Sequence, residues 1–370
     1  MGHKVGDLLL TEVAKRLQAC VRGEDLAARL GGDEFVVLLQ DAPPQEVEHI
    51  VNRIARALSR PYELAAQRVT TGASIGVVSD LTRYSTPNEV LEHADIAMYR
   101  AKELGCTTLH YSDALYKEVS ARQRTESELQ SALGSDALRL VYQPVLSLES
   151  GETVFVEALL RWQHPTRGLL APEAFLEVAE ETGLIVPLGL WALRTACAEL
   201  AAADVAFGVS VNLSRRQLLR PELLEETERV LRDTGLSPKR LRFEVTESAV
   251  VSHHTAAEQL RTLRALGVQL MLDDFGTGYS SLSALHHLPW QALKIDRAFV
   301  QGITCDPRSL EIVRTMLALA RSLGLEVVAE GVETAAQAQS LRALGCRYAQ
   351  GYLFAKPRPL AELTLAQQVV

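Results

Sequence analysis

The sequence predicts an α/β protein in which a smaller domain precedes a (β/α)₈ barrel. From about residue 138 onward, short apolar strands with polar ends alternate with helices, as in a barrel of parallel strands. Before residue 113 the strands are shorter and include a hairpin. No glycine-rich dinucleotide-binding turn follows the first of the later strands, which favours a closed barrel over an open doubly wound sheet. The length of 370 residues fits this organisation at roughly 150 residues per domain.

Residues 1–112 are predicted to form the smaller α/β domain. Apolar residues recur at helical spacing from Leu8 to Ala19, and Gly31-Gly32 provides a tight turn between two strand-like runs. Gly105 is a typical residue for ending a helix. The elements expected here are a helix at 8–19, a hairpin at 29–39, a helix at 46–58, a strand at 70–78 and a helix at 87–104.

Residues 113–133 are charged and strongly helix-forming, with no glycine or proline before Gly134. We expect a helical linker that feeds the barrel domain, residues 124–365, whose first helix overlaps the linker. Eight strands with intervening helices in roughly 230 residues match the size of a (β/α)₈ barrel. The strands expected are 138–143, 154–160, 208–212, 241–246, 268–273, 292–296, 326–330 and 348–353.

Composition excludes several protein classes. Thirty-eight basic and 46 acidic residues give a net charge of −8, which argues against a non-specific nucleic-acid binder. The sequence contains no run of roughly 18 uncharged apolar residues, so no membrane span is predicted. The first residues lack the apolar core of a signal peptide. The five cysteines are far apart and odd in number, so we expect neither a disulfide framework nor a zinc cluster, and a cytoplasmic location fits best.

Polar residues recur at or near the ends of the predicted barrel strands, mostly within apolar surroundings. A buried carboxylate is costly unless it is paired or binds a metal, and carboxylates that converge on one barrel mouth repel one another. Oxygen ligands favour Mg²⁺ or Mn²⁺, and two such ions could support phosphoryl displacement. The residues are Glu157, Asn212, Glu244, Asp273, Asp274, Asp296 and Glu330.

Each of these carboxylates also has an ordinary interpretation. A single carboxylate at a strand end is commonly a helix N-cap or a surface residue. Asp273-Asp274, followed by Phe275-Gly276, could form a simple turn. The metal interpretation is favoured because strand after strand presents the same chemistry at the same end.

Several ordered motifs resemble the EAL-domain family of cyclic di-GMP phosphodiesterases. The resemblance covers roughly residues 124–365, and it implies a modified TIM barrel with one antiparallel strand. It also implies Mg²⁺- or Mn²⁺-dependent hydrolysis of cyclic di-GMP to linear pGpG, with two metal ions per site. The matching motifs are Glu157-Ala158-Leu159 with Arg161-Trp162, Asp273-Asp274-Phe275-Gly276-Thr277-Gly278, Lys294-Ile295-Asp296, Glu330-Gly331-Val332-Glu333 and Gln350-Gly351-Tyr352.

The resemblance assigns roles to individual residues. It implies that Lys294 holds the attacking water and offsets phosphate charge, that Glu330 is a metal ligand or the general base, and that Glu247 steadies the loop 275–281. No histidine lies in a matching motif, and we expect the histidines, His164 among them, to lie at the surface. The resemblance makes Glu157, Asn212, Glu244 and Asp273 ligands of the first metal, Asp274 and Asp296 contributors to the second, and Gln143, Arg161 and Gln350 substrate contacts.

No substitution at these positions departs from the family, so an active enzyme is the expected function. The alternative is a non-catalytic receptor that binds cyclic di-GMP and signals to a partner. Such receptors usually lack one of the metal carboxylates, and none is lacking here. The family also implies a homodimer formed through the barrels.

The first region resembles the GGDEF family of diguanylate cyclases through Gly31-Gly32-Asp33-Glu34-Phe35. Arg22 and Asp25 precede this motif at the offset of the family's product-inhibition site, where they would bind cyclic di-GMP. A surface ion pair is the alternative for these two residues. Asp7 is placed to meet a guanine edge.

The same region departs from the GGDEF family at its start. The earlier strand with a metal-binding aspartate is absent before Met1, and Cys106-Thr107 stands where Arg-Asn is usual. We therefore expect a truncated or mis-assigned start, an open sheet edge and no synthesis of cyclic di-GMP. A sensor or membrane anchor upstream is compatible with this expectation. The domain would still bind GTP and regulate the barrel through residues 113–133.

Overall fold

The computed structural model describes residues 3–64, 67–250, 254–276, 285 and 287–367. The chain divides into two compact units, Met1–Arg124 and Thr125–Val370. The division falls within helix α4 (Asp113–Leu133), whose bounds agree with the predicted linker. We describe each unit separately.

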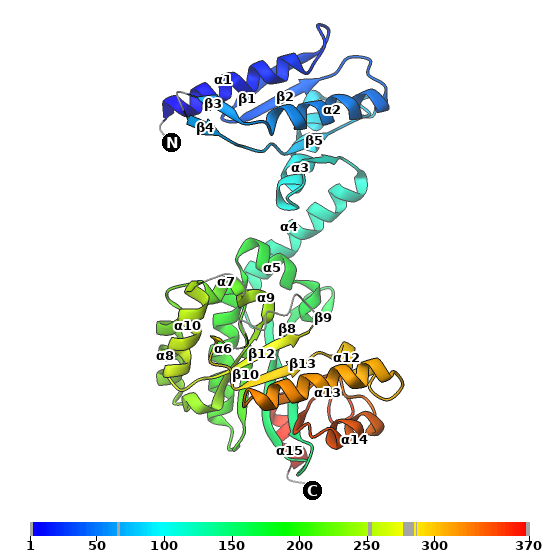
Figure 1. Cartoon of the computed structure of the whole chain (residues 1–370). Coiled ribbons are helices and arrows are strands. Elements are labelled where there is room, and N and C mark those ends of the chain that lie inside the picture. Colours follow the sequence, from blue (N-terminus) through cyan, green and yellow to red (C-terminus); the bar gives the residue numbers. More distant parts are fainter. Residues whose placement is uncertain (1–2, 65–66, 251–253, 277–284, 286, 368–370) are drawn as a thin grey trace. The chain divides into compact units, whose positions relative to one another are not determined.

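A closed barrel of eight strands forms the second unit (Figure 1). Around the ring, hydrogen-bonded neighbours follow in the order β8, β10, β11, β12, β13, β14, β15 and β7, and β7 pairs with β8 to close it. All pairings in the ring are parallel except those of β7, which runs antiparallel to β15 and β8. A short turn joins β7 to β8, so the two must be antiparallel. The predicted modified (β/α)₈ barrel is confirmed.

Helices surround this barrel and connect its strands (Figure 1). The strands are β7 (Leu138–Ser147), β8 (Thr153–His164), β10 (Gly208–Asn212), β11 (Leu241–Thr246), β12 (Gln269–Phe275), β13 (Ala292–Ile295), β14 (Glu326–Ala329) and β15 (Tyr348–Ala349). Outside the ring, β9 (Gly168–Leu170) pairs with the end of β8. The helices are α5 (Leu176–Thr182), α6 (Ile185–Ala202), α7 (Arg215–Leu218), α8 (Leu223–Thr234), α9 (Glu247–Val250), α10 (His254–Ala265), α12 (Arg297–Gln301), α13 (Pro307–Ser322), α14 (Ala335–Ala343) and α15 (Leu360–Gln367), with short 3₁₀ turns at Pro172–Ala174 and Pro238–Arg240.

An apolar layer fills the barrel beneath its mouth. Phe155, Met271 and Val328 are at most 2% exposed, and each stands two residues before a polar residue at or near the mouth end of its strand. Side chains two residues apart on a strand share a face, so both sets point into the barrel. The cluster comprises Val145, Phe155, Met271, Ala292 and Val328, with Tyr348 packed against it. The polar groups at the mouth therefore lie directly above an apolar layer that excludes water.

Helix α6 is the one helix in the described part of the chain that is long and apolar enough to cross a membrane. Its buried residues, such as Leu193 and Cys197, belong to the main hydrophobic core around the barrel. Arg194 and Glu199 are exposed on the same helix. Part of the apolar surface of α6 therefore packs against the rest of this unit.

All five cysteines of the chain are free thiols, as expected from their spacing.

The first unit contains three separate two-stranded sheets among its described residues. Phe35 and Val37 of one sheet and Ile75 of another pack against the same core cluster around Leu17 and Ile50, although the two sheets are not paired. Its elements are α1 (His3–Ala19), β1 (Leu26–Gly31), β2 (Glu34–Leu38), α2 (Pro44–Leu58), β3 (Tyr62–Leu64), β4 (Gln67–Val69), β5 (Ile75–Val77), α3 (Pro87–Glu103) and β6 (Thr108–His110).

Four predicted strands are wrong in extent by four residues or more. Strands β7 and β8 continue four residues beyond the predicted ends at 143 and 160, to Ser147 and His164. Residues 70–74 are not in a strand, and only β5 remains of the run 70–78. The run 348–353 is reduced to β15, because the chain turns at Gly351, where the backbone of Val332 leaves no room for a side chain. The short strands β3, β4, β6 and β9 were not predicted, because three-residue strands carry too few alternating positions to give a signal.

We predict that Leu129→Ala destabilises the barrel unit by about 2–5 kcal/mol, because it removes a fully buried side chain. Leu129 lies in the last turns of α4 and packs in a cluster with Trp162 and Leu188. Urea unfolding followed by tryptophan fluorescence reports this unit, since all three tryptophans lie in it. The exposed neighbour Gln130→Ala serves as control. Equal stability of the two variants would contradict the packing described.

Candidate functional site

Eight strands bring polar side chains to one end of the barrel. Parallel strands present their carboxyl ends at the same mouth. On the antiparallel strand β7, Gln143 reaches the same level because it lies opposite Glu157 in the register. Glu330 and Gln350 immediately follow their strands but remain hydrogen-bonded to the neighbouring strands through their backbone N–H groups. The residues are Gln143, Glu157, Asn212, Glu244, Asp273, Lys294, Glu330 and Gln350.

Lys294 lies at the centre of this set. Its side chain is 1% exposed, and its Nζ lies 2.5 Å from Glu244 Oε2 and 3.2 Å from Glu157 Oε2. It also forms an ion pair with Glu330 and lies 3.7 Å from Asp273 Oδ1. One ammonium therefore faces four carboxylates in a buried space. The cluster carries an excess of negative charge that Lys294 alone cannot balance.

The pKa values of the cluster reflect this imbalance. Burial and the charge of Glu157 raise the pKa of Glu244 well above its ordinary value. Burial raises the pKa of Glu330 to about 8, against the opposing charge of Lys294. Although burial alone would lower it, the pKa of Lys294 is raised well above its ordinary value by Asp273, Glu157, Glu244 and Glu330. Lys294 is thus permanently charged, while two of its partners tend to keep protons.

Two amide side chains bond to Glu157, and a third, Gln143, bonds to one of them. Asn212 Nδ2 donates to Glu157 Oε1 at 3.0 Å, and Gln350 Nε2 donates to Glu157 Oε2 at 2.7 Å. Gln350 Nε2 also lies 3.1 Å from Gln143 Oε1, and Gln143 Nε2 donates to the backbone oxygen of Ala355. Burial alone would raise the pKa of Glu157, but the charge of Lys294 and these hydrogen bonds together lower it. Glu157 is therefore an ionised carboxylate held in one orientation.

The two aspartates after β12's apolar run differ in setting. Asp273 is buried beside Lys294, whereas Asp274 is half-buried and has a positive φ of 55°. The Asp273 carboxylate accepts a hydrogen bond from the backbone N–H of Asp274. Burial, followed by the charges of Asp273 and Asp296, raises the pKa of Asp274. Aspartate tolerates this left-handed conformation better than most residues, so two adjacent carboxylates fit at the mouth.

Asp296 also caps a helix, one of the two ordinary roles given above for a strand-end carboxylate. Its carboxylate accepts a hydrogen bond from the backbone N–H of Ala298 and caps the N-terminus of α12. The ordinary interpretation of a strand-end carboxylate thus applies here. Its negative charge nevertheless contributes to the raised pKa of Asp274.

The remaining predicted barrel residues lie around this cluster. Arg161 follows Glu157 by four residues on β8 and is half-buried, with Nη1 bonded to the backbone oxygen of Leu160. Glu247 is buried at the start of α9. Of the loop 275–281 that Glu247 is predicted to steady, residues 277–281 lie outside the described residues. The expected surface position of His164 is wrong, since it is 3% exposed.

The GGDEF-like residues of the first unit lie on an exposed hairpin. Gly32 has a positive φ of 50°, and its carbonyl accepts two hydrogen bonds from Arg29. Asp33 and Glu34 are exposed, and Phe35 is half-buried. Gly31 pairs with Glu34 across the turn. The predicted hairpin is therefore present, with its acidic residues in solvent.

Arg22 and Asp25 both have partners within the first unit. Arg22 forms an ion pair with Glu46. The Asp25 carboxylate accepts hydrogen bonds from the backbone N–H groups of Arg22 and Gln40, which lower its pKa. The two side chains do not form the ion pair that was the ordinary alternative for them.

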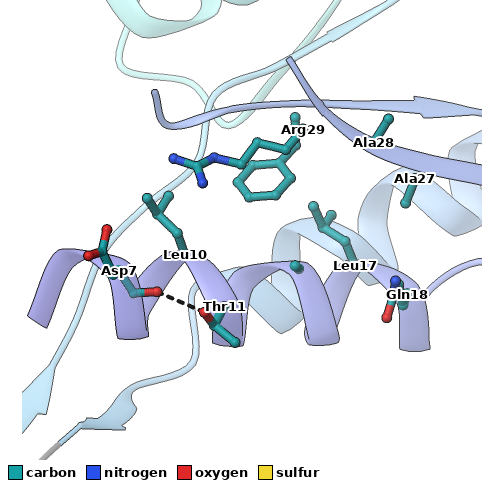
Figure 2. A pocket seen from close by; sticks show the side chains of 10 residues that line it. Asp7, Leu10, Thr11, Leu17, Gln18, Ala27, Ala28 and Arg29 are labelled. Carbon is teal, nitrogen blue, oxygen red and sulfur yellow. Dashed lines mark hydrogen bonds between the residues drawn. The ribbon is translucent and has the colours of Figure 1, made fainter. Parts of the chain in front are cut away.

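A cavity of about 440 Å³ lies between α1 and the β1–β2 hairpin (Figure 2). Figure 2 shows Leu10 and Leu17 of α1 pointing toward the strand that carries Ala27 and Arg29. Asp7 lines the cavity, and its backbone oxygen accepts a hydrogen bond from Thr11. The cavity combines an apolar wall with one carboxylate and one guanidinium.

The barrel-mouth residues have the chemistry to hold hard divalent cations. Glu244 Oε1 is buried without a hydrogen-bond partner, and the donors at the mouth are carboxylate and amide oxygens. Within the described ranges, no three His, Cys, Asp or Glu side chains surround a common point for a metal. Lys294 Nζ accounts for this, because it lies where the carboxylates converge. Charge and donor type fit a cation, although the side chains are arranged around the lysine.

Comparison with protein families gives two matches along the chain. The EAL domain matches residues 126–357, and the diguanylate cyclase GGDEF domain matches residues 1–107.

Curated relatives match almost the whole chain. An uncharacterized signaling protein of Caulobacter vibrioides is 42% identical over 98% of this chain and 46% of its own length. The bifunctional diguanylate cyclase/cyclic di-GMP phosphodiesterase MucR of Pseudomonas aeruginosa is 40% identical over 98% of this chain and 54% of its own length. The chain thus spans about half the length of these relatives.

Solved structures match the barrel. The PaMucR phosphodiesterase in complex with c-di-GMP is 41% identical, with a TM-score of 0.62 over 65% of this chain and 99% of that one. The FimX EAL domain of Pseudomonas aeruginosa bound to c-di-GMP is 30% identical, with a TM-score of 0.59 over 63% and 96% of the two chains.

We predict that Mn²⁺ raises the Tm of the metal-free chain, because cations relieve the repulsion around Lys294. A ligand at 100 times its Kd adds about 2.7 kcal/mol of stability. Asp273→Asn removes one mouth carboxylate and should reduce this gain, measured by differential scanning fluorimetry with and without Mn²⁺. Glu228→Gln, an exposed carboxylate on α8, is the control and should respond like the wild type. An Mn²⁺ effect that is equal in all three proteins would place the cation elsewhere.

Proposed function

The chain belongs to the EAL domain family, with a GGDEF domain ahead of its barrel, and on that premise we propose that it hydrolyses cyclic di-GMP to linear pGpG. The observation that carries this proposal is the set of four carboxylates around the buried Lys294, of which three are buried and Glu330 is 20% exposed. An anionic phosphodiester cannot approach such a mouth unless cations are present as well. Relatives named for cyclic di-GMP phosphodiesterase activity, and EAL structures bound to c-di-GMP, support the choice of substrate.

The proposed cofactors are two Mg²⁺ or Mn²⁺ ions held by oxygen ligands at the mouth. The residues that would hold them are Glu157, Asn212, Glu244, Asp273, Asp274, Asp296 and Glu330. When bound, such ions lower the pKa of water and stabilise negative charge on a phosphodiester. Asn212 contributes a neutral oxygen, which limits the number of charges around the ions.

The chain's own residues supply orientation and proton transfer. Lys294 is permanently charged and buried, so it can hold the water and offset charge that develops on the phosphate. Glu330 forms an ion pair with Lys294 at the mouth and is the proposed ligand or general base, which would accept a proton from the water. The water gives a proton to Glu330 and its oxygen forms a bond to phosphorus, while one bond from phosphorus to a ribose oxygen breaks and that oxygen takes up a proton. Gln143, Arg161 and Gln350 are the proposed substrate contacts, and the proposed assembly is a homodimer through the barrels.

The barrel's proposed activity is tested by incubating the full chain with cyclic di-GMP and Mn²⁺. We predict that pGpG forms, and that Glu157→Ala lowers kcat by at least about 100-fold, because a fixed, ionised ligand is lost. Chromatography of the nucleotides measures the product, and circular dichroism checks that the variant is folded.

Absence of pGpG from the wild type would reject the proposal. Binding of cyclic di-GMP without hydrolysis would instead identify the barrel as a receptor. Full activity in the Glu157→Ala variant would reject the assignment of Glu157 as a cation ligand.

We further propose that the first unit does not synthesise cyclic di-GMP and that it binds GTP. Asp33 and Glu34 lie in solvent on the hairpin, and Cys106-Thr107 stands where the GGDEF family usually has Arg-Asn. The cavity beside Asp7 and Arg29 supports nucleotide binding, since a carboxylate can accept hydrogen bonds from a guanine edge.

We predict that the Glu157→Ala variant, whose barrel cannot degrade the product, forms no cyclic di-GMP from GTP and Mg²⁺. GTP is expected to change the rate of cyclic di-GMP hydrolysis by the wild type, and deletion of residues 1–112 should abolish that change. Product analysis and initial rates are the measurements. Cyclic di-GMP made by the variant, or a GTP response that survives the deletion, would contradict this account.

A further inference from the structure

Strand β8 continues past the carboxylate cluster and ends in a hairpin with β9. Trp162 pairs with Leu170, and His164 pairs with Gly168. Arg161 stands four residues beyond Glu157, about 13 Å along the strand. Alternation puts Arg161 on the same face of β8 as Glu157, and Trp162 and His164 on the opposite face. The position of Arg161 therefore depends on what holds this extension of β8 in place.

The hydrogen bonds of His164 define the state of its ring. Nδ1 lies 3.2 Å from the backbone nitrogens of both Thr166 and Arg167, so Nδ1 must be the acceptor. The proton is then on Nε2, which lies 3.0 Å from Glu128 Oε2. His164 is a neutral side chain, 3% exposed, that donates to a carboxylate on the linker helix α4. Both ring nitrogens have hydrogen-bond partners, so His164 links the β8–β9 hairpin to α4 and is not available as a base.

Further contacts fasten the same hairpin to the end of α4. Arg167 lies over the ring of Trp162 and 3.8 Å from Glu128 Oε2. Leu129, next to Glu128 on the helix, is fully buried in the cluster that contains Trp162. The backbone N–H of Gln163 donates to Ala137, just after the helix. The outer face of β8 is thus bound to α4 while its inner face carries Arg161.

We propose that Glu128 is a positioning residue, which sets the affinity of the barrel for cyclic di-GMP by holding His164 and, through it, the segment of β8 that carries Arg161. The inference rests on the proposed function, because it takes Arg161 as a contact to the substrate phosphates. It adds that α4 controls substrate affinity through this one carboxylate. Glu128 lies outside the carboxylate cluster, so the chemical step is unaffected.

The test compares Glu128→Ala with Glu128→Gln in the full chain. We expect Glu128→Ala to raise KM by about three- to tenfold with kcat within about twofold of wild type, because binding geometry is loosened. Glu128→Gln keeps an oxygen that can accept from His164 Nε2, and its KM should stay within about twofold of wild type. Glu126→Ala removes the same charge from the same helix two residues away and is the matched control. Thermal unfolding of each variant accompanies the kinetics.

Three outcomes would overturn the inference. One is a KM for Glu128→Ala equal to that of Glu126→Ala. Another is a loss in kcat without a change in KM, and the third is a Glu128→Gln variant as impaired as Glu128→Ala.

Titration calorimetry with cyclic di-GMP, with Ca²⁺ in place of Mg²⁺ or Mn²⁺ and the absence of pGpG checked by chromatography, gives the affinity without turnover. If the wild type binds but does not hydrolyse, the proposed enzyme fails, and the same variants still test the role of Glu128 through Kd. If the wild type neither binds nor hydrolyses, both proposals are rejected.

Discussion

The ion cluster at Lys294 is the constraint on which the barrel's chemistry depends. One fully buried ammonium touches or approaches four carboxylates, and an isolated set of this kind would be strongly disfavoured. Lys294 neutralises only part of the negative charge of the four carboxylates, as the raised pKa values of Glu244 and Glu330 indicate. The remaining imbalance gives the mouth an affinity for cations that a neutral polar pocket would not have. In our account, those cations make an anionic dinucleotide an acceptable ligand for an acidic protein.

The fold produces this cluster through the geometry of strands. Closing the barrel brings the carboxyl ends of the parallel strands to one mouth, and the antiparallel β7 contributes Gln143 at the same level. Beneath them, Phe155, Met271 and Val328 exclude water, which strengthens each electrostatic interaction above. The amides of Asn212 and Gln350 then fix Glu157. Outside the barrel, the C-terminal end of β8 is held against α4 by the hydrogen bond between His164 and Glu128.

Sequence pattern predicted the barrel well, because its strands are short apolar runs that end in polar residues at a regular period. Of the carboxylates predicted at the mouth, Glu157, Glu244, Asp273 and Glu330 lie around Lys294, because parallel strands share one mouth. It left open whether Asp296 would bind a metal or cap α12, because that choice depends on a side-chain direction that spacing does not encode. The resemblance placed Lys294 at the site, and the structure adds that its Nζ lies among the carboxylates themselves. The burial of His164 was missed for a similar reason, since its partner Glu128 lies 36 residues earlier in the chain. In the first unit, the predicted strand at residues 70–78 is mostly irregular, as alternation alone cannot supply a neighbouring strand to pair with.

The most direct measurement is a titration of the metal-free chain with Mn²⁺, followed by electron paramagnetic resonance. Free Mn²⁺ gives a sharp signal that binding broadens, so the number of ions bound per chain can be counted. The account predicts two bound ions per chain, with binding lost when Glu157 is replaced by alanine. A chain that binds no Mn²⁺, or binds it equally well without Glu157, would contradict the claim that the carboxylates around Lys294 form a cation site.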